Sequence, residues 1–408
     1  MKSLLLTAAL AFGLMPAMQA QPAAKLAPTP PMGWNSWNWH GKKNINEAVV
    51  RETIDAMVSS GLRDAGYNYV VVDGGWRDTQ LGPNGELYAH PVKFPSGMKA
   101  LADYAHSKGL KFGVHTTPGT HDCGGDAVGG FGHEEVHVKQ FVEWGLDFVK
   151  VDKCKFQPGW SEEQVRAVYT KWHDLLAHCG RDIVLSISAY VFRDWYPGVC
   201  QMARTTYDIR DHNTGGAGFD DGKPHGPGHS FLSVMVIAEE NNRAAAAAGS
   251  GYWNDPDMMV VGRHGLTQEE QKAHFALWCI MSAPLMLGND PRNMTAEEKA
   301  ILLNREAIAI DQDPTEQGRR IRQEDGTEVW LKRLHGGRLA VLLLNRDATA
   351  TKSITFHARD GSLAGKWSAR DVNAHADLGT FDTAITKATP PRSSWFLLLT
   401  PQTAQSTP

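Results

Sequence analysis

The chain has 408 residues, of which 42% are apolar and 21% are charged, and its formal net charge is -4. This composition is typical of a globular protein, and the length suits one large barrel with a smaller second domain. The weakly acidic balance leaves no basic footprint for nucleic acid or for an acidic membrane surface, so we expect neither as a partner.

The first 20 residues have the pattern of a secretory signal peptide. Lys2 gives a positive start, an apolar core runs from Leu4 to Met15, and cleavage is expected after Ala20. The core is too short to anchor the chain in a bilayer, and no other stretch is long and apolar enough to span one. We therefore predict an exported protein, periplasmic or extracellular.

Helical and extended patterns alternate through the next part of the chain. Helices are predicted over 46–61, 98–108, 136–144 and 162–179. Short apolar runs predict strands at 69–73, 111–115, 146–151, 183–188, 204–208, 251–254 and 284–287. About eight such alternations over roughly 280 residues are typical of an α/β fold, the (β/α)8 barrel, which we assign to residues 26–314.

The character of the sequence changes after Pro314. Helical spacing disappears, and short strands are predicted at 328–331, 339–344, 353–356 and 394–399, with Gly and Asp turns between them. These strands predict a small antiparallel β domain over residues 315–402, which we expect to pack against the barrel.

The strand at 146–151 carries two charges within an apolar run. Alternation along a strand places Lys150 and Asp152 on the same face. They either meet a ligand where the strand ends at an open mouth, or they form a buried ion pair that only holds structure.

Several further acids follow predicted strands, where barrel enzymes keep their active sites. They are Asp73, Asp152, Asp208, Asp255 and Asp257. Retaining glycoside hydrolysis needs two carboxylates, one as nucleophile and one as acid/base. Asp208 shares a predicted strand face with Arg204, which would lower the carboxyl pKa and suit a nucleophile better than an acid. Spacing alone therefore leaves the two roles open.

Two other motifs suggest different chemistry. Residues 133–137 fit the H-E-x-x-H pattern of zinc peptidases, but no third ligand is evident and the motif directly follows a Gly-rich loop. That loop, 124–132, lacks the Lys-Ser/Thr of a phosphate-binding loop. We expect no metal and no cofactor, and a zinc peptidase remains an alternative that inhibition by a chelator would support.

The five cysteines permit disulfides in an exported chain and leave one unpaired. Cys123 and Cys154 both lie just past predicted strand ends, so a bridge between them would brace two active-site loops. Cys179 and Cys200 form a second possible pair. Cys279 lies in an apolar run and is expected to be a buried free thiol.

Several ordered motifs together resemble glycoside hydrolase family 27, which holds α-galactosidases and α-N-acetylgalactosaminidases. They include MGWNSW at 32–37, WGLDFVKVDKC at 144–154 and WNDPDM at 253–258, with further matches at 113–123, 283–290 and 308–314. The resemblance covers roughly 28–314. It implies a TIM barrel with a C-terminal antiparallel β-sandwich, and an exo-glycoside hydrolase that removes terminal α-galactosyl residues from a carbohydrate by double displacement.

The resemblance also implies roles for individual residues. Asp152 would be the nucleophile and Asp208 the acid/base. The substrate-binding residues would be Lys150 on a sugar hydroxyl, Trp34 as the wall of the first subsite, Asp73 on an outer hydroxyl, Arg204 on the sugar and the acids, and Asp257 as a supporting residue. The family also bridges the cysteines that match Cys123 and Cys154.

Three substrate-binding positions depart from the family pattern. Gly74 replaces the second of two paired acids, His115 replaces an aromatic residue, and Ser188 replaces a Glu after a shortened segment, which is similar to the N-acetylgalactosaminidase version. A lost carboxylate removes a charge-assisted hydrogen bond that discriminates between sugars. The sugar could therefore be an α-N-acetylgalactosaminide, a β-L-arabinopyranoside or an α-1,6-glucan unit, and a non-catalytic sugar-binding protein is the remaining alternative.

Overall fold

The computed structural model describes residues 26–154, 159–210, 217–220, 231–262 and 265–402. The predicted signal peptide lies outside these residues. Within the described part of the chain, no helix combines the length and the apolar character needed to cross a membrane.

Eight parallel strands form the centre of the larger domain, in the order β7-β6-β5-β4-β3-β2-β1-β8. The strands are β1 (Met32–Asn35), β2 (Tyr69–Val72), β3 (Lys111–Thr116), β4 (Phe148–Asp152), β5 (Val184–Ser188), β6 (Met202–Arg204), β7 (Trp253–Asp255) and β8 (Leu285–Leu287). A parallel bridge between Met259 and Leu287 joins the segment after β7 to β8 and closes the barrel. The predicted (β/α)8 TIM barrel is confirmed.

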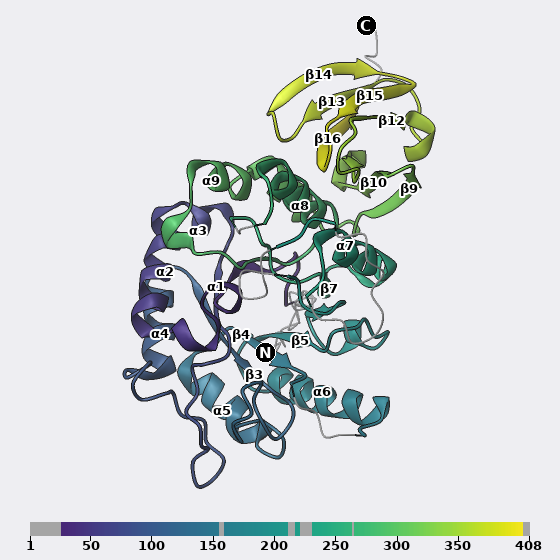
Figure 1. The fold of residues 1–408 in the computed structure, drawn as a ribbon. Coiled ribbons are helices and arrows are strands. Elements are labelled where there is room, and N and C mark those ends of the chain that lie inside the picture. Colours follow the sequence, from purple (N-terminus) through teal and green to yellow (C-terminus); the bar gives the residue numbers. More distant parts are fainter. Residues whose placement is uncertain (1–25, 155–158, 211–216, 221–230, 263–264, 403–408) are drawn as a thin grey trace, which may run out of the picture.

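Helices surround the strands (Figure 1). They are α1 (Trp37–Asn44), α2 (Glu47–Ser59), α3 (Leu62–Ala65), α4 (Gly97–Ser107), α5 (Glu134–Trp144), α6 (Glu162–Ala177), α7 (Val234–Arg243), α8 (Gln268–Ile280), α9 (Ala296–Leu302) and α10 (Arg305–Asp311). Local signals set several helix starts. The Asn46 side chain caps α2, and a reciprocal capping box between Ser161 and Gln164 opens α6.

The interior of the barrel follows from strand alternation. Along β4, Phe148 packs with Tyr69, Val71 and Val184 in a core cluster inside the barrel. Two and four residues later, Lys150 and Asp152 share that face, nearer the carboxyl end of the strand. The other strand face carries Val149 and Val151, which pack against the helices.

The smaller domain holds eight antiparallel strands. A six-stranded sheet has the order β14-β13-β16-β11-β10-β9, and β12 pairs with β15. The strands are β9 (Arg319–Glu324), β10 (Thr327–Arg333), β11 (Leu339–Asn345), β12 (Lys352–His357), β13 (Trp367–Asp371), β14 (Ala376–Phe381), β15 (Ala384–Thr389) and β16 (Ser393–Pro401). The expected antiparallel β domain is confirmed, although four of its strands were not predicted.

The β domain packs beside α8, away from the centre of the barrel (Figure 1). Asn304 donates to the Val372 carbonyl at 3.1 Å, and Arg392 lies 3.1 Å from Glu270 of α8. The domain is therefore anchored to the helical layer at a distance from the strand ends.

One local prediction was wrong, and a second disulfide that the sequence left possible is not formed. Strand β6 ends at Arg204, so Asp208 lies in the following loop and shares no strand face with Arg204. The ladder between β6 and β7 ends with the bond from the Thr205 N–H to the Asp255 carbonyl, three residues before Asp208. Cys179 and Cys200 are free thiols whose sulfurs face the backbone carbonyls of Arg181 and Tyr196. Cys279 is a buried free thiol, as expected.

Candidate active site

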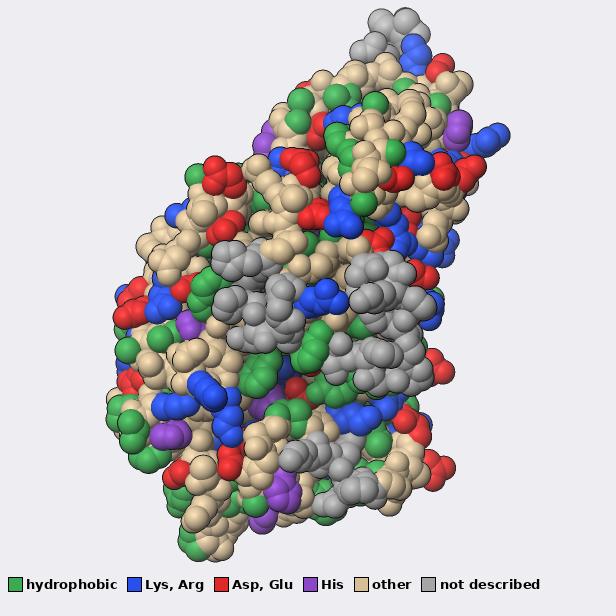
Figure 2. All heavy atoms as spheres, viewed as in Figure 1, with side chains coloured by type: hydrophobic (Ala, Val, Ile, Leu, Met, Phe, Trp, Pro, Cys, Tyr) green, Lys and Arg blue, Asp and Glu red, His purple; other side chains and the backbone are tan. Residues whose placement is uncertain are grey.

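A cavity of about 480 Å³ opens at the carboxyl ends of the barrel strands. In Figure 2, acidic and hydrophobic side chains meet at a hollow near the middle of this face. The charged side chains that line the cavity are Lys42, Lys43, Asp73, Lys150, Asp152, Arg204, Asp208 and Asp257. Carboxyl ends of parallel strands meet at one edge of a barrel, so residues from distant parts of the sequence converge here.

The floor of the cavity is an ion cluster built on β2, β3 and β4. The Lys150 ammonium lies 2.8 Å from Asp73 Oδ2 and 3.5 Å from Asp152 Oδ2. Burial alone would raise the pKa of Asp152, but Lys150 and then His115 outweigh it and lower that pKa. Lys150 and Asp152 therefore form a buried ion pair and also line the cavity, and their contact with a ligand stays a prediction.

Asp73 is held more tightly than Asp152. Its Oδ2 accepts from Lys150 and from the Asn35 amide at 2.9 Å, and its Oδ1 accepts from the Gly74 N–H at 2.8 Å. Burial opposes ionisation, yet Lys150 and His115 lower the pKa of Asp73 far below its usual range. Asp73 is thus a fixed negative charge that faces the cavity.

His115 lies behind the two carboxylates and is fully buried. Its Nε2 is 3.7 Å from Asp152 Oδ2, 3.9 Å from Asp73 Oδ1 and 3.5 Å from the Cys123 sulfur. His115 is not among the residues that line the cavity. It therefore contacts the two acids from behind the cavity surface, and its predicted role in substrate binding stays a prediction.

Tyr190 approaches the same nucleophile candidate from the loop after β5. Its hydroxyl donates to Asp152 Oδ1 at 3.0 Å, and its ring stacks on Tyr207 with centroids 5.3 Å apart. Tyr190 has a φ of 67°, a left-handed conformation that is unusual for a residue with a Cβ. The shortened segment before it thus turns sharply and directs the phenol into the cavity.

The expected disulfide between Cys123 and Cys154 is present and joins the loops after β3 and β4. Both cysteines line the cavity, beside His115 and Tyr190. The bridge therefore braces the two loops that flank Asp152.

The second carboxylate, Asp208, lies nearer to solvent. Its side chain is 40% exposed, against 10% for Asp152. Arg204 holds Asp208 at 3.1 Å and Asp257 at 2.9 Å. Asp257 also accepts from the backbone N–H of Ile209 at 2.8 Å, which fixes the residue next to Asp208. Burial raises the pKa of Asp257, against the effect of Arg204.

The predicted wall residue Trp34 does not line the cavity. It is completely buried, and its indole N–H donates to the Asn289 carbonyl at 2.8 Å. On β1 it faces the helical layer, whereas Asn35 faces the barrel interior and reaches Asp73. Trp37, at the start of α1, lines the cavity instead. A Cβ added at Gly74 would lie 3.1 Å from Cζ3 of Trp37, so the Trp37 ring packs against the position of the missing acid.

Ser188 is buried at the end of β5, directly beside Asp152 in the sheet register. Its hydroxyl has no hydrogen-bond partner among the described residues, and it does not line the cavity. The position is therefore next to the nucleophile candidate but behind the surface that a sugar would touch.

The H-E-x-x-H motif lies on α5, outside the cavity. Glu134 is buried and paired with Lys171 of α6 at 2.8 Å, and the His137 Nε2 faces the Gly85 carbonyl at 3.0 Å. These side chains therefore have structural partners. The potential ligand atoms of His115, Cys123 and Asp152 lie within 4.8 Å of one another, but Cys123 is part of the disulfide.

Several residues that line the cavity were not predicted from the sequence, among them Trp37, Tyr190, Phe231 and Met258. Trp37 lies inside the motif at 32–37 and Met258 inside the motif at 253–258, so the sequence already marked both positions as candidates for the site. Tyr190 and Phe231 lie in loops, where no periodic pattern reports the direction of a side chain.

Comparisons with known proteins find one family for both domains of the chain. The sequence profile of the α-galactosidase A family matches residues 29–313, and that of the α-galactosidase C-terminal β-sandwich domain matches residues 324–399. Alpha-galactosidase 2 of Arabidopsis thaliana is 40% identical over 81% of this chain and 78% of its own length. Alpha-galactosidase A of Cellvibrio japonicus is 40% identical over 85% and 83%.

The fold is shared with a solved structure. The crystal structure of α-galactosidase I from Mortierella vinacea superimposes with a TM-score of 0.87 at 30% sequence identity, over 93% of this chain and 98% of the other. The chain therefore belongs to the α-galactosidase family, glycoside hydrolase family 27, and is a glycoside hydrolase.

Proposed function

We propose that this protein is an exported exo-glycosidase that removes terminal α-galactosyl residues by a retaining double displacement. The observation that carries the mechanism is the pair of carboxylates in one cavity. Asp152 is buried beside Lys150 and His115, whereas Asp208 stands at the more exposed mouth. Retaining hydrolysis needs one ionised nucleophile and one carboxyl that exchanges a proton with the leaving oxygen.

In the first step an Asp152 oxygen attacks the anomeric carbon while the bond from that carbon to the leaving oxygen breaks. Asp208 gives its proton to the leaving oxygen. In the second step Asp208 takes a proton from a water, the water oxygen bonds to the anomeric carbon, and the ester bond to Asp152 breaks. The lowered pKa of Asp152 supports this assignment, because the nucleophile must be ionised before attack.

The names of the relatives support a galactosyl sugar, since those with about 40% identity are called α-galactosidases. Asp73 and Lys150 present a carboxylate and an ammonium to the cavity, which suits recognition of hydroxyl groups. The Trp37 ring beside Gly74 takes the place of a second acid. Galactosides thus remain the proposed substrates, with N-acetylgalactosaminides, arabinopyranosides and α-1,6-glucans as the competitors to test.

Export is supported by the signal-like N-terminus and by the Cys123–Cys154 bridge, because disulfides persist in oxidising compartments.

The test is a set of initial rates on nitrophenyl α-galactoside, α-N-acetylgalactosaminide, β-L-arabinopyranoside and α-glucoside. We expect preference for the α-galactoside and, by NMR, the α-anomer as first product. A β-anomer would overturn the retaining mechanism, and preference for another glycoside would overturn the sugar assignment. If the protein only binds sugars, galactose binds but no glycoside is hydrolysed, and the Asp152→Asn variant binds it equally well.

A further inference from the structure

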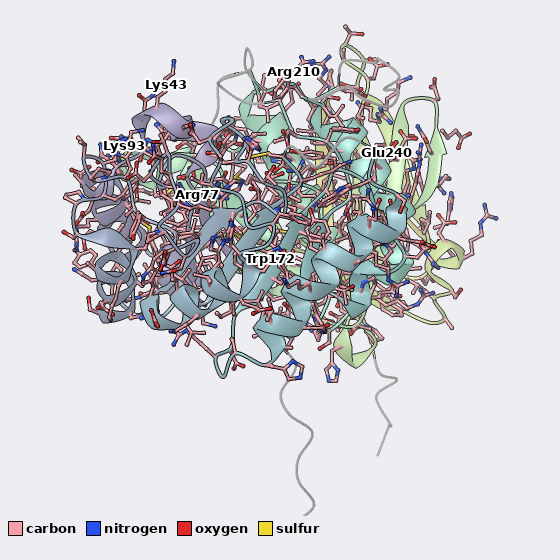
Figure 3. The ribbon with its side chains drawn as sticks, turned by 90° about the horizontal axis from the view of Figure 1, so that it is seen from below. Lys43, Arg77, Lys93, Trp172, Arg210 and Glu240 are labelled. Carbon is pink, nitrogen blue, oxygen red and sulfur yellow. A yellow bond between two sulfur atoms is a disulfide. The ribbon has the colours of Figure 1, made fainter. Side chains whose placement is uncertain are left out.

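The mouth of the cavity has two unlike walls. One wall comes from the last residues of α1 and is polar, with Lys42, Lys43 and Asn44. The other comes from the loop after β6 and is apolar, with Ile209 and Phe231. In Figure 3, Lys43 of the first wall and Arg210, the neighbour of Ile209, lie at the same edge of the molecule. A group that passes this mouth therefore meets a polar surface on one side and an apolar one on the other.

Phe231 is the exposed part of the apolar wall. It is 44% exposed and also lines the cavity, whereas the equally exposed Phe131 does not. Its φ is 70°, in the left-handed region that side chains with a Cβ rarely adopt. An exposed aromatic ring held by an unfavourable backbone conformation often marks a functional site.

The backbone next to Phe231 is tied to the proposed acid/base. The Leu232 N–H donates to the Asp208 carbonyl at 2.8 Å, and the Arg210 N–H donates to the Leu232 carbonyl at 2.8 Å. These bonds make a short parallel bridge between Ile209 and Leu232. The Phe231 residue is therefore held at a fixed place along the segment that carries Asp208.

The side on which the leaving group exits follows from the proposed function, on which this inference rests. Asp208 gives its proton to the leaving oxygen, so the leaving group must lie beside Asp208. The floor around Asp152 is closed and charged, whereas the Asp208 side chain reaches toward solvent. A pyranose has one apolar face formed by its C–H groups, and a flat aromatic ring is a matching surface for it.

We propose that Phe231 forms the subsite for the leaving group and holds a second sugar ring joined to the cleaved bond. Phe231 is then a specificity-determining residue for an oligosaccharide or a polysaccharide side chain. The terminal sugar is recognised by the charged floor, and the next sugar by the aromatic wall.

The experiment compares two substrates with the same terminal sugar. The leaving group of melibiose is glucose, whereas the leaving group of α-galactosyl fluoride is a single fluoride ion. For the Phe231→Ala variant we expect kcat/KM to fall about tenfold on melibiose and to stay within about twofold on the fluoride. The Phe231→Tyr variant keeps a flat ring and should retain activity on both. Since kcat/KM reports steps up to the first irreversible one, a slow second displacement does not mask the effect.

Phe131→Ala is the matched control. Phe131 is also an exposed phenylalanine, at 43%, but it packs on Trp160 and does not line the cavity. The inhibition constant for galactose reports whether the protein is folded and whether the floor still binds the terminal sugar. It should be equal in the wild type and in all three variants.

The outcomes separate the two proposals. If the wild type hydrolyses neither substrate, the proposed function fails. If it hydrolyses both and Phe231→Ala lowers both equally, or neither, the subsite is overturned. A loss on nitrophenyl α-galactoside without a loss on melibiose would also overturn it, because the wall would then hold an aromatic group rather than a sugar. If Phe231→Ala does not fold, Phe231→Leu is measured instead, because leucine keeps the bulk of the side chain without a flat face. A tenfold fall in kcat/KM on melibiose alone would then support the subsite.

Discussion

The floor and the mouth of the cavity are built in opposite ways. The floor (Asp73, His115, Lys150 and Asp152) lies on or directly after three adjacent strands, and the register places His115 beside Lys150. One side of the mouth (Asp208, Ile209 and Phe231) lies in loops that are joined by a few backbone hydrogen bonds. Hydrogen bonds between neighbouring strands fix the side chains of a sheet, whereas the sequence of a loop can change at little cost to the fold.

This difference suggests that the floor and the mouth contribute to activity in different ways. Floor charges depend on one another, because the Lys150 ammonium is shared by two carboxylates. A change there should affect every substrate. A change at the mouth should affect only substrates whose leaving group reaches it. Four variants, measured on both melibiose and α-galactosyl fluoride, test this difference between floor and mouth.

Asp152→Asn should have the largest effect, since the amide cannot act as the nucleophile. We expect kcat/KM to fall by at least about 10³-fold on both substrates. Asp290→Asn is the control. Like Asp152, Asp290 is buried and paired with a basic side chain, that of Arg292, but it does not line the cavity. Loss on melibiose with normal turnover of the fluoride would remove Asp152 from the nucleophile role.

Lys150→Met should come next, with a fall of about 100-fold near neutral pH, because two buried carboxylates lose their shared cation. Lys150 helps to hold the pKa of Asp152 below its usual value, so its removal raises that pKa. Activity that needs ionised Asp152 is then lost at a higher pH during acidification. A pH profile of kcat/KM should show the acid limb moved upward, and an unchanged limb would contradict the ion cluster.

Tyr190→Phe removes the hydroxyl that donates to Asp152 at 3.0 Å. A hydrogen bond to a charged group contributes about 1.5 kcal/mol at the low end of its range, so we expect kcat/KM to fall by about tenfold on both substrates. Tyr69→Phe is the control, since Tyr69 lies at the opposite end of its strand from the cavity. If only melibiose were affected, Tyr190 would belong to the mouth rather than to the floor.

Gly74→Ala should have the smallest effect. The new methyl group would lie 3.1 Å from Cζ3 of Trp37, so the ring must shift by a few tenths of an ångström. We expect kcat/KM to fall about threefold on both substrates, as for mild overpacking. At Gly198 an added Cβ meets nothing within 4 Å, which makes Gly198→Ala the control. A tenfold loss would mean that Trp37 cannot adjust.

Periodic patterns in the sequence were sufficient for much of the fold. The strand around Phe148 was recognisable because its apolar residues are buried on both faces, which also made Lys150 and Asp152 stand out. The strands of the β domain that were predicted are the apolar ones, such as β11 and β16. Strands β9 and β14 were missed because their side chains are mostly polar and exposed, so no alternation marks them.

The sequence by itself determined the alternation of strands and helices, the presence of two candidate carboxylates, and cysteines suitably placed for one bridge. These features follow from local periodicity and from residue type. Only the tertiary structure decided that Trp37 rather than Trp34 faces the cavity, that Asp208 lies in a loop, and that Tyr190 and Phe231 turn inward. The direction of a loop side chain depends on contacts with residues far away in the sequence, and neither spacing nor composition records those contacts.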